Sequence, residues 1–178
     1  FLGRVGEVEL GAGAIGGVYY FVVVMLAWGF GIGTQIIIAR RNGETNFTEI
    51  GRTVDHGLYF LLPFAIVMFA MMKFLSEGIL GGILDSAEIN EATSEYLDYR
   101  AYGIFFAFIQ VLFRAFYIGV ANTKVITYTT LVMALVNGFL DYCLIFGHFG
   151  FPEMGIAGAA LASVIAEGVA TLYYFVYT

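Results

Sequence analysis

The sequence is short of charge and of cysteine, and each shortage limits what the protein can be. Only 12% of its 178 residues are Asp, Glu, Lys or Arg, about half the share found in soluble domains. Cys143 is the one cysteine, which excludes an internal disulfide framework and a cysteine-based metal site. The net charge of -6, with no basic stripe, argues against binding to nucleic acid.

Apolar residues fill the chain instead. They make up 60% of the sequence, and the mean hydropathy is +0.86. Residues 11–39 contain no charged residue, a run longer than the roughly 20 residues that cross a bilayer. The composition predicts an all-α polytopic membrane helix bundle with five transmembrane helices. The predicted spans are approximately 11–39, 57–75, 101–121, 125–147 and 155–177.

The segments between and within these spans carry further signals. Residues 77–98 are acidic and predict a solvated surface loop. Gly29 and Gly33 are spaced as a pair of small residues through which two membrane helices can approach closely. The start of the fifth span is rich in Gly and Ala around Gly158 and predicts close packing in the same way.

Basic residues favour one orientation of the bundle. Alternate connections place five of the eight basic residues on one side, against three on the other. The five are Arg40, Arg41, Arg52, Arg114 and Lys124, and the three are Arg4, Lys73 and Arg100. Because basic residues concentrate on the cytoplasmic side, we expect the loop Arg40–Asp55 in the cytoplasm and Phe1 outside. An additional span entering from the cytoplasm would then precede Phe1.

Asp141 is the only charged residue between positions 125 and 147, and Asn137 precedes it by four positions. Residues four apart share one face of a helix. A carboxylate inside a membrane costs several kcal/mol unless it is paired, protonated or facing water, so Asp141 is a candidate functional residue. A buried Asp that serves only helix packing is the alternative, although a neutral amide would serve packing at lower cost.

The fifth span carries the other intramembrane acid. Glu167 follows Ser163 by four positions, and Thr130 lies on the same stripe of the fourth span as the Asn137–Asp141 pair. If the two stripes face each other, they offer carboxylate, amide and hydroxyl oxygens of the type that Na⁺ accepts, or a proton site. Thr130, Glu167 and Gln35 of the first span are candidate cavity-lining residues. Interhelical hydrogen bonding by Gln35 and solvent exposure of Glu167 are the alternatives.

Catalytic constellations are missing from the spans. Ser163 has no His within any span, because both His residues lie at span boundaries. Asp141 has no second intramembrane Asp, and neither His joins an acidic cluster at metal-ligand spacing. These patterns argue against an enzyme.

Three segments resemble the multidrug and toxic compound extrusion (MATE) family of transporters. Residues 31–44 (GIGTQIIIARRNGE) are similar to the end of the family's second helix and the following loop. Residues 122–124 (NTK), 137–142 (NGFLDY) and 149–163 (FGFPEMGIAGAALAS) are similar to its fourth-to-sixth helix region. The resemblance implies that residues 1–178 are helices two to six of a six-helix amino-terminal lobe, and thus part of a longer, two-lobed protein.

The same resemblance implies a function and a site. MATE proteins export organic cations and drugs across the cell membrane in exchange for Na⁺ or H⁺, and need no other cofactor. Asn137 and Asp141 match the family's cation- or proton-binding pair on helix five, which is also where Na⁺ would bind. Ser163 matches a hydroxyl ligand on helix six that is often Thr. An Asp near the end of helix one would complete the site and would fall just before Phe1.

The expected partners are the lipid bilayer, small organic cations or drugs, and the first helix and carboxy-terminal lobe of the same protein. The expected location is the bacterial inner or plasma membrane. Two other functions remain open. A lipid-linked oligosaccharide flippase of the same superfamily would show cationic residues in its cavity, whereas acids are expected inside these spans. A non-transporting membrane-assembly subunit would use Asp141 and Glu167 only as structural partners.

Overall fold

The computed structural model describes residues 1–84 and 86–178. Asp85, part of the expected acidic loop, lies outside the described residues. The fold is an all-α membrane helix bundle, as the sequence predicts. Its helices are α1 (Glu7–Gly43), α2 (Phe47–Phe74), α3 (Ser76–Gly81), α4 (Ala87–Arg100), α5 (Gly103–Gly119), α6 (Lys124–Phe146) and α7 (Gly155–Tyr177), with short 3₁₀ turns η1 (Leu2–Arg4) and η2 (His148–Gly150).

Among the described residues, α1, α2, α6 and α7 are each long and apolar enough to cross a membrane. Helices α4 and α5 together make a fifth candidate span, because they meet at a break of two residues with a bend of 56°. Ala101 and Tyr102 form this break. It contains no proline, so the change of direction comes from the local backbone rather than from a missing amide donor.

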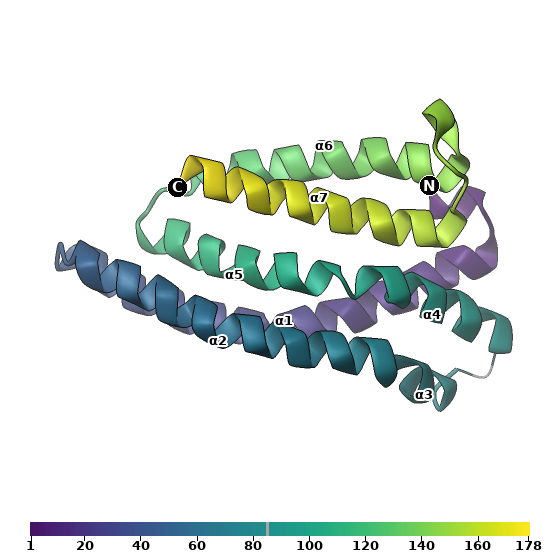
Figure 1. Ribbon diagram of the computed structural model, residues 1–178, viewed down its shortest axis with the longest axis horizontal. Helices are drawn as coiled ribbons and strands as arrows, with labels where there is room; N and C mark the ends of the chain where they lie inside the picture. Colours follow the sequence, from purple (N-terminus) through teal and green to yellow (C-terminus); the bar gives the residue numbers. More distant parts are fainter. Residues whose placement is uncertain (85) are drawn as a thin grey trace.

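The helices lie roughly along the long axis of the molecule (Figure 1). Helix α5 contacts α1, α2 and α7, and α4 contacts α1 and α7. The main apolar core lies among α1, α2, α4 and α5, around the fully buried residues Ala27, Leu61, Ile104 and Phe108. Helices α6 and α7 form an antiparallel pair on one side of this core.

The α6–α7 pair is closely packed because α7 begins with small residues. A methyl group added at Gly158 would lie 2.6 Å from the Leu144 carbonyl oxygen, so the two backbones are in direct contact there. The close packing expected for this segment is therefore confirmed. The pairing expected through Gly29 and Gly33 is wrong for the described chain, since no atom lies within 4 Å of a methyl at either position. Gly31 is the glycine of that segment that packs against α5, at Val111.

Two segments expected to be loops are largely helical. The loop predicted over Arg40–Asp55 reduces to residues 44–46, because α2 already begins at Phe47. Its first turn is capped by Asn46, whose side chain accepts a hydrogen bond from the Glu49 amide at 3.3 Å. Most of the acidic loop predicted over 77–98 belongs to α3 and α4, and α4 is capped by the Ser86 hydroxyl.

Ion pairs stabilise the short turn between α1 and α2. Arg41 and Arg40 donate hydrogen bonds to the Glu44 carboxylate at 2.8 and 3.0 Å. These two guanidinium groups lower the pKa of Glu44 below its usual value. The arginines also lie in the last turn of α1, where positive charge is favourable against the helix dipole. The ion pairs with Glu44 therefore stabilise the end of α1 at Gly43.

Candidate functional site

The predicted ion-binding residues lie on the facing sides of α6 and α7. The Asn137 amide of α6 donates a hydrogen bond to the Ser163 hydroxyl of α7 at 3.3 Å, and that hydroxyl donates to the Ala159 carbonyl at 3.1 Å. Asp141 lies one turn after Asn137 on α6. The structure thus brings Asn137 and Ser163 into direct contact and places Asp141 on the adjacent turn.

Asp141 is the carboxylate whose environment is unusual. Its Oδ1 atom is buried and has no hydrogen-bond partner among the described residues. Buried polar atoms in native proteins nearly always have a partner, and an unpaired buried carboxylate is costly. Asp141 as a whole is partly exposed, whereas Cys143, Leu144 and Ile145, which follow it on α6, are buried. An oxygen of this kind, next to an amide and a hydroxyl, fits a proton or a small hard cation.

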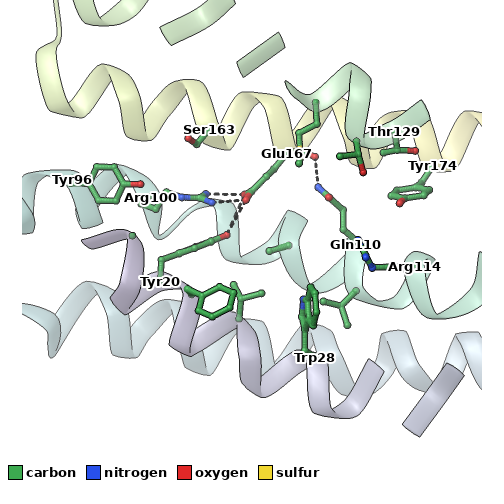
Figure 2. A pocket seen from close by; sticks show the side chains of 17 residues that line it. Tyr20, Trp28, Tyr96, Arg100, Gln110, Arg114, Thr129, Ser163, Glu167 and Tyr174 are labelled. Carbon is green, nitrogen blue, oxygen red and sulfur yellow. Dashed lines mark hydrogen bonds and ion pairs between the residues drawn. The ribbon is translucent and has the colours of Figure 1, made fainter. Parts of the chain in front are cut away.

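A cavity of about 400 Å³ lies between α7 and the rest of the bundle (Figure 2). Its lining comes from α1, α4, α5, α6 and α7, so one side chain or more from each of these helices faces it. Ser163, Glu167 and Thr130 line this cavity, whereas Asn137 and Asp141 are not among its lining residues. Ser163 therefore both contacts Asn137 and lines the cavity.

An ion pair occupies one end of this cavity. The Arg100 guanidinium donates two hydrogen bonds to the Glu167 carboxylate, at 2.9 and 2.5 Å, and the Tyr20 hydroxyl donates to the same carboxylate at 3.2 Å (Figure 2). The Arg100 guanidinium also lies 3.6 Å from the centre of the Tyr20 ring. Only 9% of the Arg100 side chain and 14% of the Glu167 side chain are exposed. Such bidentate pairs fix geometry as well as charge, so this one joins α1, α4 and α7.

Gly103 makes room for this ion pair. A methyl group at position 103 would overlap both the Arg100 guanidinium and the Glu167 carboxylate. Gly103 is the first residue of α5, directly after the break that follows α4. The bend and the glycine together let Arg100 reach α7 from the end of its own helix.

Two further polar residues of α5 face the same cavity. The Gln110 amide donates to the Glu167 backbone carbonyl at 2.8 Å and to the Thr171 hydroxyl at 3.2 Å. One turn later, the Arg114 guanidinium lies 5.4 Å from the centre of the Trp28 ring. Arg114 and Trp28 also line a second cavity of about 200 Å³, and Gln35 of α1 lies there. Gln35, one of the candidate cavity-lining residues, is thus among the residues that line this second cavity.

The family model described as MatE matches residues 1–143, most of the chain. The chain belongs to the MatE family. This confirms the family resemblance of its motifs. Among curated MatE relatives, a "Probable multidrug resistance protein NorM" from Rhizobium meliloti is 34% identical over 171 residues, and one from Agrobacterium fabrum is 27% identical over 176 residues. These alignments cover 96% and 99% of this chain but 36% and 38% of the relatives.

Solved MatE structures share the fold. A structure titled as the outward-facing conformation of a multidrug resistance MATE family transporter matches with a TM-score of 0.90 at 20% identity, over 99% of this chain and 38% of that one. The inward-facing conformation of such a transporter matches with a TM-score of 0.86 at 22% identity, over 97% and 38%. This chain therefore spans a little over a third of the length of the MatE proteins that it matches.

Sequence reasoning missed part of this MatE cavity. The orientation count assigned both Arg114 and Arg100 to connections between spans, yet both line the cavity. The expectation that acids alone occupy the span interiors is therefore wrong. Arg100 stands outside the apolar window that marks the third span, and its partner Glu167 lies 67 positions away. Tyr20, Arg100 and Glu167 lie far apart in the sequence, so no spacing between neighbouring residues predicts that they form a cluster.

Proposed function

We propose that this chain is part of a membrane exporter in which Na⁺ or H⁺ binds at Asp141, with Asn137 and Ser163 as neighbouring ligands, and drives the export of drug-like organic cations. The observation that carries this proposal is the buried Asp141 Oδ1, which has no hydrogen-bond partner within residues 1–84 and 86–178 and lies on the turn next to the Asn137–Ser163 contact. The names of the relatives, multidrug resistance proteins, support the export of drugs. No catalytic step is proposed.

Ion binding would be coupled to cargo export through the charge of Asp141. A bound cation or proton neutralises Asp141, while Ser163 contacts the neighbouring Asn137 and also lines the cavity. Ion binding that favours one conformation, and cargo binding that favours the other, couple the two fluxes by differential affinity. Asp141 lies outside the cavity lining, so the ion and the cargo need not occupy the same place.

The proposed site would be completed by a preceding helix. The Phe1 ring lies 6.5 Å from the Tyr142 ring and 6.1 Å from the Phe146 ring, measured between ring centres. Tyr142 follows Asp141 directly, so a residue attached before Phe1 would lie at the same end of α6. In a longer parent protein this is where the expected Asp of helix one would approach Asp141. A carboxy-terminal lobe would close the other side of the cavity.

The proposed orientation places the α1–α2 turn in the cytoplasm. Arg100 and Arg114 line the cavity, so neither counts as a basic residue of a connection. Without them, the connections on the proposed inner side hold four basic residues and those on the outer side hold two. The α1–α2 turn and the α5–α6 connection lie at one end of the molecule, and the α6–α7 connection lies at the other (Figure 1). The membrane would be a bacterial inner or plasma membrane, since the relatives named above are bacterial.

A lipid-linked oligosaccharide flippase is the second candidate, because Arg100 and Arg114 give the cavity the cationic groups that an anionic pyrophosphate requires. However, Arg100 is neutralised by Glu167, which leaves one unpaired arginine. A non-transporting assembly subunit would use the same residues only as structural partners. In that role, loss of Asp141 would lower expression rather than transport.

The test is dye efflux from cells that express the full-length parent protein, driven first by a Na⁺ gradient and then by a proton gradient. We expect efflux to follow one gradient and to vanish in Asp141→Asn at unchanged expression. Asp55→Asn is the matched control, because Asp55 is an exposed acid near the start of α2. Gradient-driven efflux that persists in Asp141→Asn would remove Asp141 from the coupling site. A well-expressed wild type without dye efflux would favour the flippase or the assembly subunit.

A further inference from the structure

We propose that Arg114, beside Trp28, forms a subsite that binds the carboxylate of an aromatic cargo molecule. The relevance of this subsite to export rests on the proposed function, but the binding itself does not. It narrows the cargo to aromatic molecules that carry an anionic group in addition to any positive charge.

Arg114 differs from the other cavity arginine in its lack of a counter-charge. Arg100 is paired with Glu167, whereas no acidic side chain among the described residues lies within ion-pair distance of Arg114. Arg114 is exposed and lies within α5, where it lines both the 400 Å³ cavity and the 200 Å³ cavity. A charged side chain within a membrane-spanning bundle is expected to meet a partner or a water-filled pathway.

The neighbouring Gln110 and Thr129 side chains already donate to protein acceptors, which leaves Arg114 as the charged donor available to a ligand at this end. Gln110 already donates to the Glu167 carbonyl and to Thr171. The Thr129 hydroxyl donates to the Val125 carbonyl at 2.8 Å. Because Arg100 offsets the charge of Glu167, the sign of the potential near Trp28 is set by Arg114. The pocket therefore favours an anion at this position.

The surroundings select an aromatic molecule to carry that anion. Figure 2 shows Trp28 and Tyr174 on opposite sides of the cavity near Arg114. Flat apolar walls of this kind bind planar rings, and a guanidinium binds a carboxylate through paired hydrogen bonds. The volume of the larger cavity lies within the range of drug-sized ligand pockets. The smaller cavity extends it along α1 toward Gln35.

The test measures binding of two matched probes to the purified full-length parent protein: a xanthene dye with a free carboxylate and the ethyl ester of the same dye. Fluorescence polarisation reports both dissociation constants. We expect Arg114→Gln to weaken binding of the carboxylate dye roughly tenfold or more, as for the loss of a hydrogen bond to a charged group. Binding of the ester should change little. Arg40→Gln is the control, because Arg40 is exposed and lines no described cavity.

Three results would overturn the subsite. The first is an unchanged dissociation constant for the carboxylate dye in Arg114→Gln, and the second is an equal loss for both dyes. The third is displacement of the carboxylate dye by phosphatidylglycerol at low mole fraction in wild type but not in Arg114→Gln, which would assign Arg114 to a lipid phosphate. If dye binding depends on Arg114 but no gradient-driven efflux is observed, the subsite is supported and only the proposed export function is contradicted.

Discussion

At the scale of single residues, the pair of Arg100 and Glu167 is the least exposed of the salt bridges among the described residues. Its two hydrogen bonds, the Tyr20 hydroxyl and the Tyr20 ring satisfy both charges at once. A buried ion pair adds little net stability over apolar residues, but removal of one partner leaves an uncompensated charge. A substitution of Arg100 or Glu167 alone is therefore expected to be more destabilising than a substitution of both.

This difference predicts an interaction between two substitutions. We expect Glu167→Gln in the full-length parent protein to lower the free energy of unfolding by about 3–5 kcal/mol, because Arg100 remains buried without its counter-charge. Adding Arg100→Gln to this variant should restore part of the loss. Chemical unfolding in detergent of the wild type, both single variants and the double variant measures the coupling energy. Single losses that simply add would show that the two residues act independently.

The contrast between the two polar clusters shows what residue spacing can reveal. Asn137 and Asp141 are four positions apart on one helix, so their shared face follows from the helix period. Ser163 joined them through family resemblance, and the structure places it against Asn137. The pairing of Arg100 with Glu167 joins two helices across 67 positions. Only the packing of α4 against α7 determines that contact, so the sequence could not predict it.

At the scale of helices, each predicted span overlaps a candidate membrane-crossing segment, whereas the polar helical segments were predicted poorly. Residues 47–56 of α2 and most of α4 are helical without being strongly apolar. A usable signal existed at α2, where Asn46 is followed three positions later by Glu49, a pattern typical of a helix start. The bend after α4 has no proline to mark it, and the third predicted span, 101–121, covers α5 but leaves out α4.

The α6–α7 contact depends on the absence of a side chain at Gly158. We expect Gly158→Ala to lower the free energy of unfolding by about 1–3 kcal/mol, because the added methyl would overlap the Leu144 backbone, which cannot move as a side chain can. Thermal unfolding of the full-length parent protein in detergent measures this. Gly33→Ala is the control, since the described chain leaves its methyl free, and a gain of about 0.5–1 kcal/mol is expected from helix propensity.

An equal loss in both glycine variants would indicate a general intolerance of the helices to substitution. A loss confined to Gly158→Ala would locate the effect at the contact of α6 with α7, the two helices that carry Asn137, Asp141 and Ser163.

At the scale of the whole molecule, the proposed orientation can be tested by chemical labelling. Thr123 and Glu153 are exposed and lie in connections at opposite ends of the bundle. In intact cells, we expect a membrane-impermeant maleimide to label Glu153→Cys and to label Thr123→Cys only after permeabilisation. Cys143 is buried and should add little background within this chain. The opposite pattern would invert the orientation and place the α1–α2 turn outside.

The pairing of charges also determines how the membrane voltage can act on this lobe. The field does no net electrical work when Arg100 and Glu167 move together, because their charges sum to zero. A charge that crosses the full field gains or loses about 2.3 kcal/mol per 100 mV. In the proposed exporter, Arg114 and the occupancy of Asp141 are charges within the bundle that this energy can reach. A cargo carboxylate bound to Arg114 would cancel that charge, so the voltage dependence of the loaded step would reflect any positive charge on the cargo and no longer that of Arg114.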